Sequence, residues 1–230
     1  MIDWHTHVLP NIDDGSKNID ESLALLKMLK EQGVDTVMAT PHFNANEQRV
    51  SSFVERRQRA YEELIGALPE NFPDITLGAE VYYYSGISRM EDLKLLRLQG
   101  SKVLLLEMPM AKWSDYTVRE LIEISNSRDF KLMIAHIDRY MDYQSTKTLE
   151  NLLGSGILMQ ANASFFNEFF KKRKALNLLN QGFLHVIGSD CHNTSSRPPK
   201  IGSAFELIEK KFGARYLRGM DDFGRSLLGK

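Results

Sequence analysis

The sequence predicts an α/β fold in which short parallel strands alternate with helices, and it favours a closed barrel over an open doubly wound sheet. Short β-branched or leucine-rich runs recur along the chain, each followed by a longer segment whose apolar residues have helical spacing. Such alternation makes the strands parallel, because each helix is the crossover between two neighbours. Polar and ionisable residues end nearly every run. A barrel close to the (β/α)8 type collects all strand ends around one mouth, whereas a doubly wound sheet would cluster them at one switch point.

Seven strands are expected, at residues 2–5, 34–40, 75–82, 103–108, 132–136, 157–162 and 184–189. Helices are expected at residues 20–32, 50–68, 117–129, 145–153, 167–180 and 202–212. Asp20 is the expected N-cap of the first helix, and Gly33 ends this helix and turns the chain into the second strand. Thr117 followed by Glu120 forms a capping box that opens the third helix. The sequence contains no linker, so we expect a single domain over residues 1–230.

Composition and charge exclude several classes of protein. The chain has 230 residues with 29 Lys and Arg against 30 Asp and Glu, so its net charge of −1 produces no overall field toward nucleic acid or an anionic membrane. No apolar run approaches the roughly 20 residues that a spanning helix needs. A single cysteine cannot form an internal disulfide, and the chain opens without the charged and apolar segments of a signal peptide. We therefore expect a cytoplasmic protein without a transmembrane segment.

The strand ends carry the residue types with which proteins bind catalytic metal ions. His5 with His7, and Asp190 with His192, are two residues apart and project to the same side of an extended chain. Imidazoles and carboxylates without a cysteine cluster suit Zn, Mn or Fe at a catalytic site. Their number exceeds the needs of one ion, so two or three ions are expected, with Glu80 as a bridging carboxylate. The residues at the strand ends are His5, His7, His42, Glu80, Glu107, His136, Asn162, Asp190 and His192.

Each of these residues also has an ordinary structural interpretation. A single histidine is more often a surface or buried polar residue than a ligand. For the whole set, that interpretation would require histidines and acids to fall by accident at the same end of nearly every strand. Asp14, within Asp13-Asp14-Gly15, is equally well explained by a turn. His185 lies inside an apolar run, and we interpret it as a core residue or a support for a ligand.

Several short motifs recur in a specific order and spacing. They are His5-Thr6-His7, Asp13-Asp14-Gly15, Thr40-Pro41-His42, Gly78-Ala79-Glu80, Leu106-Glu107-Met108-Pro109, Ala135-His136 with Arg139, and Gly188-Ser189-Asp190-Cys191-His192-Asn193. Together they resemble the polymerase and histidinol phosphatase (PHP) superfamily. Within it, the chain is most similar to the manganese-dependent tyrosine-protein phosphatases of bacterial capsular and exopolysaccharide operons. The resemblance extends from Met1 to about Phe212.

The resemblance implies a distorted (β/α)7 barrel, which is the TIM-like PHP fold, and three Mn²⁺ ions, with Fe, Zn or Co as alternatives. It also implies phosphate-binding roles for Arg139 and Arg197, although each arginine alone is more typical of a solvated surface charge. The family commonly has Pro-Glu-Arg where this chain has Ile137-Asp138-Arg139. The implied ligands are His5, His7, Glu80 and Asp190 for the first ion, Glu80, Glu107 and His136 for the second, and Asp14, His42 and His192 for the third.

The expected activity is hydrolysis of phosphotyrosine, and the resemblance implies an autophosphorylated, membrane-associated bacterial tyrosine kinase as the substrate. A metal-bridging hydroxide would attack phosphorus in line while Arg139 and Arg197 hold the equatorial oxygens. The phenol leaving group has a pKa of about 10, so no strong general acid is required, and Asp138 is the candidate. The alternatives are a phosphatase for a small metabolite such as histidinol phosphate, a nuclease, and a catalytically silent metal-binding barrel. The absence of a basic groove disfavours the nuclease.

Two further features have competing interpretations. Cys191 and Arg197 have the spacing of the cysteine-dependent phosphatases, but Pro198 and Pro199 remove backbone donors that such a loop needs. The flanking Asp190 and His192 already have a metal-site explanation, which disfavours a cysteine mechanism. A basic run over residues 169–174 is ordinarily a solvated helix face. The run consists of Phe169, Phe170, Lys171, Lys172, Arg173 and Lys174. Its functional interpretation is a docking site for an acidic tail of a partner kinase.

Overall fold

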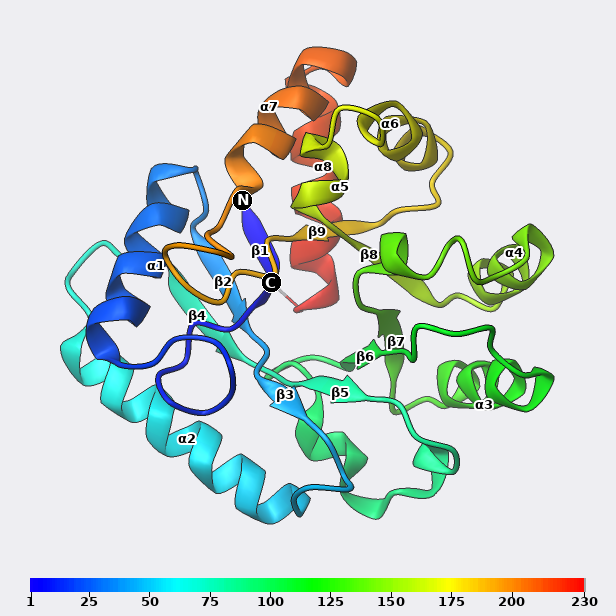
Figure 1. Ribbon diagram of the computed structural model, residues 1–230, viewed down its shortest axis with the longest axis horizontal. Helices are drawn as coiled ribbons and strands as arrows, with labels where there is room; N and C mark the ends of the chain where they lie inside the picture. Colours follow the sequence, from blue (N-terminus) through cyan, green and yellow to red (C-terminus); the bar gives the residue numbers. More distant parts are fainter. Residues whose placement is uncertain (230) are drawn as a thin grey trace.

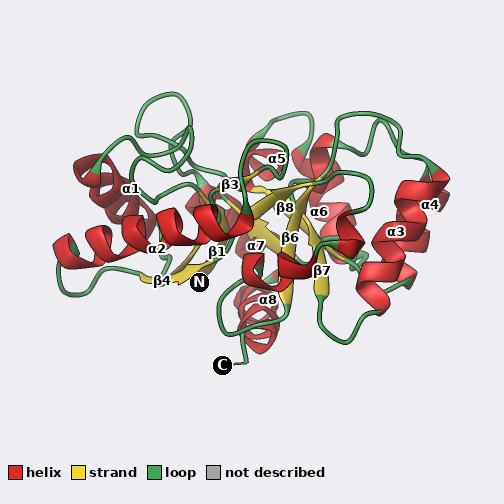
Figure 2. Ribbon diagram, turned by 90° about the horizontal axis from the view of Figure 1, so that it is seen from below, coloured by secondary structure: helices red, strands yellow, loops and turns green. Residues whose placement is uncertain are grey.

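The computed structural model describes residues 1–229 as a barrel of parallel strands surrounded by helices, viewed along the barrel in Figure 1 and from the side in Figure 2. The strands are β1 (Ile2–Thr6), β2 (Thr36–Ala39), β3 (His42–Phe43), β4 (Asp74–Leu77), β5 (Glu80–Tyr82), β6 (Val103–Glu107), β7 (Lys131–Ile134), β8 (Leu158–Asn162) and β9 (Val186–Gly188). The α-helices are α1 (Ile19–Glu31), α2 (Val50–Ala67), α3 (Asp115–Asn126), α4 (Thr146–Gly154), α5 (Ala163–Asn167), α6 (Lys172–Asn180), α7 (Ile201–Phe212) and α8 (Ala214–Leu227). The 3-10 helices are η1 (Ile87–Arg89), η2 (Glu91–Leu96) and η3 (Ile137–Arg139).

The strands close into a barrel of seven units, two of which are broken. The strand expected at 75–82 is interrupted between β4 and β5, and the strand expected at 34–40 is β2, which the short unpredicted strand β3 continues after a break. The paired strands are all parallel, in the orders β1-β2-β4 and β3-β5-β6-β7-β8-β9. The segment that directly follows β9 pairs with the end of β1. Asp190 N donates to His5 O at 2.8 Å, and His7 N donates to Cys191 O at 3.0 Å. The expected distorted barrel is confirmed, because these bonds join the last strand to the first.

The strand break at Gly78 positions Glu80. A Cβ atom at Gly78 would lie 2.3 Å from Leu98 Cδ2, so a side chain at this position would require Leu98 to move. Arg57 of α2 donates from Nη1 to Gly78 O at 2.6 Å and braces the break. Beyond it, Glu80 of β5 pairs in register with His42 of β3. The two broken strands therefore bring a carboxylate and an imidazole side by side at the mouth.

Two apolar layers stabilise the barrel, because alternate residues of each strand face opposite sides. The outer layer lies between the strands and the surrounding helices and forms the larger cluster, to which β6 contributes Leu104 and Leu106. The inner layer is a separate cluster that fills the barrel below the mouth. Its principal members are Ile2, Trp4, Met38, Leu105, Met133, Leu158 and Val186.

Helix α8, which the sequence analysis did not predict, covers the end of the barrel opposite the mouth (Figure 2). Asp221 Oδ1 of α8 accepts a hydrogen bond from Ile2 N at 3.1 Å. A Cβ atom at Gly224 would lie 3.0 Å from the Trp4 ring, so glycine permits the helix to approach the barrel closely. Gly219 and Gly224 also explain why the helix was missed, because glycine lowers helix propensity by about 1 kcal/mol per residue.

The structure corrects three details of the expected helices. The helix expected at 167–180 begins only at Lys172, as α6, and a turn over residues 168–171 separates it from α5, which was not predicted. Asn18, rather than Asp20, caps α1, because its Oδ1 accepts from Glu21 N at 2.9 Å. Ser114, rather than Thr117, caps α3 by accepting from Thr117 N at 3.1 Å. Within residues 1–229, every helix is either too short or too polar to traverse a bilayer.

Candidate metal centre

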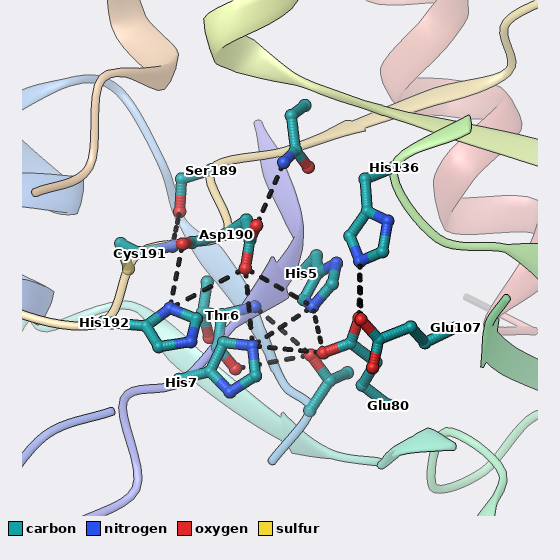
Figure 3. Close-up of polar contacts among 12 residues, drawn as sticks. His5, Thr6, His7, Glu80, Glu107, His136, Ser189, Asp190, Cys191 and His192 are labelled. Atoms are coloured by element: carbon teal, nitrogen blue, oxygen red, sulfur yellow. Dashed lines mark hydrogen bonds and ion pairs between the residues drawn. The ribbon is translucent and has the colours of Figure 1, made fainter. Parts of the chain in front are cut away.

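The mouth of the barrel brings together all nine residues that the sequence and the family resemblance proposed as metal ligands. Figure 3 labels all of them except Asp14 and His42. Their donor atoms form four overlapping groups, and within each group the atoms lie within 4.8 Å of one another. His5 and His7 come from the end of β1 and the loop after it, and Asp190 and His192 follow β9. The groups are His5, His7 and Asp190; His5, Glu80 and His136; His7, Asp14, His42 and His192; and His42, Glu80 and Glu107.

Glu80 lies at the centre of the cluster. Its Oε1 is 2.7 Å from His136 Nε2, and its Oε2 is 3.0 Å from His5 Nε2 and 2.9 Å from His42 Nδ1. Burial alone would raise the pKa of the Glu80 carboxyl, but the charge of His5 and contacts with three imidazoles hold this pKa well below its ordinary value. Glu80 is therefore an anion that touches donors of several groups, as a bridging carboxylate must.

The imidazoles are oriented with one ring nitrogen toward a fixed partner and the other toward the cluster. His5 Nδ1 lies 3.2 Å from Gln160 Oε1, an amide oxygen that can only accept. His192 Nδ1 likewise lies 3.0 Å from the carbonyl oxygen of Asp190. When the two rings are neutral, these contacts favour the proton on Nδ1 and direct the Nε2 lone pair into the cluster. This tautomer is the one that a metal ligand requires.

Two buried atoms in the mouth make no hydrogen bond of acceptable geometry among residues 1–229, although one of them, Glu80 Oε2, lies against ring nitrogens of His5 and His42. They are Glu80 Oε2 and His192 Nε2, both acceptors in the protonation states described above. In addition, His5 Nε2 and His7 Nε2 face each other at 3.2 Å. Nitrogen and oxygen donor atoms that converge in a buried site fit a cation, since leaving a buried acceptor unsatisfied is costly. The donor set therefore fits divalent metal ions bound by nitrogen and oxygen.

Asp13 is a site residue that the sequence analysis passed over in favour of its neighbour Asp14. Asp13 Oδ2 lies 2.7 Å from His7 Nδ1 and also accepts from His42 N at 3.0 Å. Burial would raise the pKa of Asp13, but the charge of His7 holds it below its ordinary value. Gly15 fixes this loop against His7, because a Cβ atom at Gly15 would lie 2.4 Å from His7 O. The Asp-Gly turn is therefore part of the site and not only a surface turn.

Tyr140 supports His136 in a similar way. Its hydroxyl oxygen lies 3.0 Å from His136 Nδ1 and accepts from Met108 N at 3.1 Å. His136 itself has a φ of 30°, and Asp190 has a φ of 55°, both in the left-handed region that non-glycine residues rarely adopt. Two of the proposed ligands are thus held in uncommon backbone conformations directly after their strands, which is typical of functional sites.

Arg139 and Arg197 converge on Asp190 at the edge of the cluster. Arg139 Nη2 forms a short ion pair with Asp190 Oδ2, and Arg197 Nη2 lies 3.0 Å from Asp190 Oδ1. Both guanidinium groups line a cavity of about 220 Å³ that Asn162 and Ser196 also border. Two planar forks of donors beside a cluster of metal-binding residues are suited to a phosphate dianion.

The structure rules out the competing cysteine loop. Cys191 is fully buried, and burial raises the pKa of its thiol to about 12, so the nucleophilic thiolate does not form near neutral pH. The amides that would have to bind phosphate are already occupied. Asn193 Oδ1 accepts from Ser195 N, Ser196 N and Arg197 N at 3.1, 2.7 and 3.0 Å.

His185 and Asp138 lie outside the groups of donor atoms. His185 Nδ1 accepts from Met159 N at 3.0 Å, and its ring contacts Phe223 of α8 at the opposite end of the barrel. It is therefore a structural residue, as expected. Asp138 Oδ1 accepts from Asn162 N at 2.9 Å, and burial raises the pKa of this carboxyl. Asn162 in turn donates from Nδ2 to Asp190 Oδ2 at 3.0 Å, which connects Asp138 to the site indirectly.

Comparisons with known proteins agree with this geometry. The family profile described as "Capsular polysaccharide synthesis, CpsB/CapC" matches residues 1–221. The tyrosine-protein phosphatase CpsB of Streptococcus pneumoniae is 32% identical over 235 residues, covering 94% of this chain and 92% of that protein. The tyrosine-protein phosphatase YwqE of Bacillus subtilis strain 168 is 28% identical over 222 residues, covering 93% and 86%.

Solved structures show the same relationship. This chain matches a structure from the crystal structures of YwqE from Bacillus subtilis and CpsB from Streptococcus pneumoniae, which are described as metal-dependent tyrosine phosphatases. The TM-score is 0.84 and the sequence identity is 25%. It covers 99% of this chain and 94% of that chain. A histidinol phosphate phosphatase from Lactococcus lactis shares the fold alone. Its TM-score is 0.52 with 13% identity, and the match covers 92% of this chain and 93% of that chain. The chain belongs to the CpsB/CapC family of capsular polysaccharide synthesis.

Proposed function

We propose that this chain is a metal-dependent phosphatase that hydrolyses phosphotyrosine on a protein. The observation that carries the proposal is the convergence of nine nitrogen and oxygen donors with two arginines that border the same carboxylate, Asp190. Relatives named tyrosine-protein phosphatases, which match over more than nine tenths of this chain, support the same reaction.

The proposed metal ligands are the nine residues of the cluster. Glu80 and the imidazoles of His5, His7 and His136 would hold ions deep in the mouth, whereas Asp14, which is 64% exposed, would act at its edge. We propose three Mn²⁺ ions, for which Fe, Zn or Co would be chemical substitutes, since this donor set accepts all of them. Bound divalent ions would supply neutralisation of phosphate charge and a water molecule that loses its proton near neutral pH.

The two arginines are proposed to bind and orient the phosphate. A monoester in the cavity of about 220 Å³ would accept hydrogen bonds from the guanidinium groups of Arg139 and Arg197. These donors would then hold the equatorial oxygens while water adds to phosphorus and the bond to the phenolic oxygen breaks. The phenolate takes up a proton to become tyrosine. Because its pKa is about 10, a weak acid suffices, and Asp138 stays the candidate for that role.

The cavities beside the cluster support a peptide substrate over a small metabolite. A cavity of about 510 Å³ is lined by Asp14 and His42 at the edge of the cluster. A second cavity, of about 930 Å³, shares Glu47, Gln48 and Ser52 with the first and extends outward along the start of α2. A groove of this length would accommodate the residues that flank a phosphotyrosine. We propose that the substrate is an autophosphorylated tyrosine kinase at the cytoplasmic face of the membrane, and that the enzyme acts in the cytoplasm.

The test is phosphate release from a phosphotyrosine peptide by protein that has been stripped of metal with a chelator. Activity should be absent after stripping and should return with added Mn²⁺. The variant E80Q should not regain activity, whereas E150Q, which makes the same change at an exposed position on α4, should. Full activity without metal would contradict the mechanism. A kcat/KM higher for histidinol phosphate than for the peptide would contradict the proposed substrate and leave the metal chemistry standing.

A further inference from the structure

The turn between α5 and α6 exposes two consecutive phenylalanines to water. Phe169 is 74% exposed and Phe170 is 92% exposed, more than any other large apolar side chain in residues 1–229. Their rings lie edge to face with centroids 5.2 Å apart and so form one small apolar surface. Phenylalanine is usually buried, and a paired exposure of this size at a single turn indicates a partner that covers it.

Four basic residues follow this pair directly, and we call residues Phe169–Lys174 the aromatic-basic tip. Lys171 pairs with Glu168 at 2.8 Å, and Lys174 lies 3.7 Å from Asp142. Lys172 lies over the Phe169 ring at 4.9 Å, and within residues 1–229 neither Lys172 nor Arg173 has a carboxylate partner. Positive charge is therefore uncompensated beside the two rings, although the whole chain carries a net charge of only −1.

We propose that the aromatic-basic tip binds an anionic lipid surface. An extended acidic peptide would need a groove, but the tip is a protruding turn, and the cavities of the mouth are lined by other residues. A bilayer requires the opposite shape. Protruding apolar rings enter the boundary between headgroups and acyl chains, and adjacent lysines and arginines contact anionic headgroups. The arrangement of Phe169, Phe170, Lys172 and Arg173 satisfies both requirements at one place.

The tip lies on the same side of the molecule as the mouth. Helix α5 begins directly after β8, whose last residue, Asn162, donates to Asp190 in the site. In Figure 1 α5 lies beside the end of β8 and α6 lies further out in the ring of helices, and in Figure 2 α5 lies on the side away from α8. A lipid surface bound at the tip would therefore hold the mouth close to that surface. This inference does not depend on the proposed reaction.

The test is co-sedimentation of the full chain with vesicles of phosphatidylglycerol and phosphatidylcholine in equal parts, compared with phosphatidylcholine alone. The chain should bind the anionic vesicles only, and about 0.5 M salt should weaken this binding by screening the charges. The double variants F169S/F170S and K172E/R173E should each bind at least tenfold more weakly, since each basic residue near such a surface contributes about a fivefold factor. Tryptophan fluorescence of F170W should shift to shorter wavelength with anionic vesicles.

Matched controls separate the tip from general effects of composition. F223S changes another partly exposed phenylalanine, on α8, and K210E/K211E reverses two consecutive exposed lysines at the end of α7. Both controls should bind like the unaltered chain, and all variants should keep the activity of the unaltered chain toward a soluble phosphotyrosine peptide. Failure of the unaltered chain to bind anionic vesicles, or equal binding by tip and control variants, would overturn the proposal. Binding of an acidic phosphopeptide through Lys172 and Arg173, without vesicle binding, would assign the tip to a protein partner instead.

Discussion

Asp13 Oδ2 lies 2.7 Å from His7 Nδ1, while Nε2 of the same ring faces Asp190 Oδ1 at 3.5 Å. A carboxylate behind an imidazole fixes the ring and raises its basicity as a ligand. We expect D13N to lower the apparent affinity for Mn²⁺ by about 10- to 100-fold, with a much smaller effect on kcat at saturating metal. The measurement is activity against Mn²⁺ concentration. D20N, an equal change at an exposed position of α1, should leave the curve unchanged.

The arginines that contact Asp190 should affect turnover more than metal binding. R139A and R197A each remove a fork of donors from the proposed phosphate site, and we expect kcat to fall about 100-fold. R139K and R197K should recover only part of this loss, because an ammonium cannot bind two oxygens in the plane of a fork. Steady-state kinetics on a phosphotyrosine peptide measure the effect. R128A, at an exposed position on the loop after α3, serves as the control, and equal losses in R128A and R139A would contradict the assignment.

Cys191 should be dispensable for the reaction. Since its thiol is buried and has a raised pKa, we expect C191A to keep activity within about threefold and to lose on the order of 1 kcal/mol of stability through the small cavity it leaves. Iodoacetamide should not inactivate the native protein at pH 7.5. Complete loss of activity in a folded C191A protein with normal metal content would reverse this conclusion.

Gly188 should not tolerate a side chain. A Cβ atom there would lie 2.5 Å from His5 Cβ and 2.9 Å from Gln160 Nε2. We expect G188A to lower the free energy of unfolding by on the order of 3 kcal/mol and to displace His5. Denaturant unfolding measures the loss. G154A, at the end of α4 where no neighbour lies within 4 Å of the new atom, should be neutral or slightly stabilising.

The contact of Asp35 with Met1 and with Arg225 of α8 should weaken at acidic pH. Asp35 accepts from the terminal ammonium of Met1 at 2.6 Å and from Arg225 of α8 at 2.8 Å, and these partners lower the Asp35 pKa to about 2. Because the pKa of Asp35 in the folded chain lies below its unfolded value of 3.8, the Asp35 carboxylate stabilises the fold at pH values above 3.8. This contribution is lost as the pH falls toward 2. Metal-free D35N should therefore be less stable than the unaltered chain at pH 6, by under about 1 kcal/mol because Asp35 is half exposed. The difference should shrink between pH 4 and 2 in denaturant unfolding, and a difference that stays constant would contradict it.

Much of the fold follows from the sequence because strand ends and periodicity are local signals. The spacing of His5 and His7 is enough to place both rings on one side of β1, and the strand order carries the other ligands to the same mouth. Asp13 could not be separated from Asp14 in this way, since neighbouring acids differ only in which one the loop turns inward. Gly15 N donates to Asp13 Oδ1 at 3.0 Å, and this turn, formed with the backbone two residues further on, is the local feature that distinguishes Asp13 from Asp14. Helix α8 was hidden because Gly224, which lowers its helix propensity, serves a close contact with Trp4 that is distant in sequence.

The seal that α8 places across the far end of the barrel makes that end a convenient attachment point. Ser226 is exposed in the last turn of α8. Figure 2 shows α8 at the end of the barrel opposite the mouth. The chain contains one cysteine, and Cys191 is inaccessible to reagents. S226C would therefore accept a dye or a biotin at a single position without further mutation. Molecules anchored to a sensor surface through this thiol would all present the mouth to solution, where encounters with phosphopeptides or vesicles could be timed one by one.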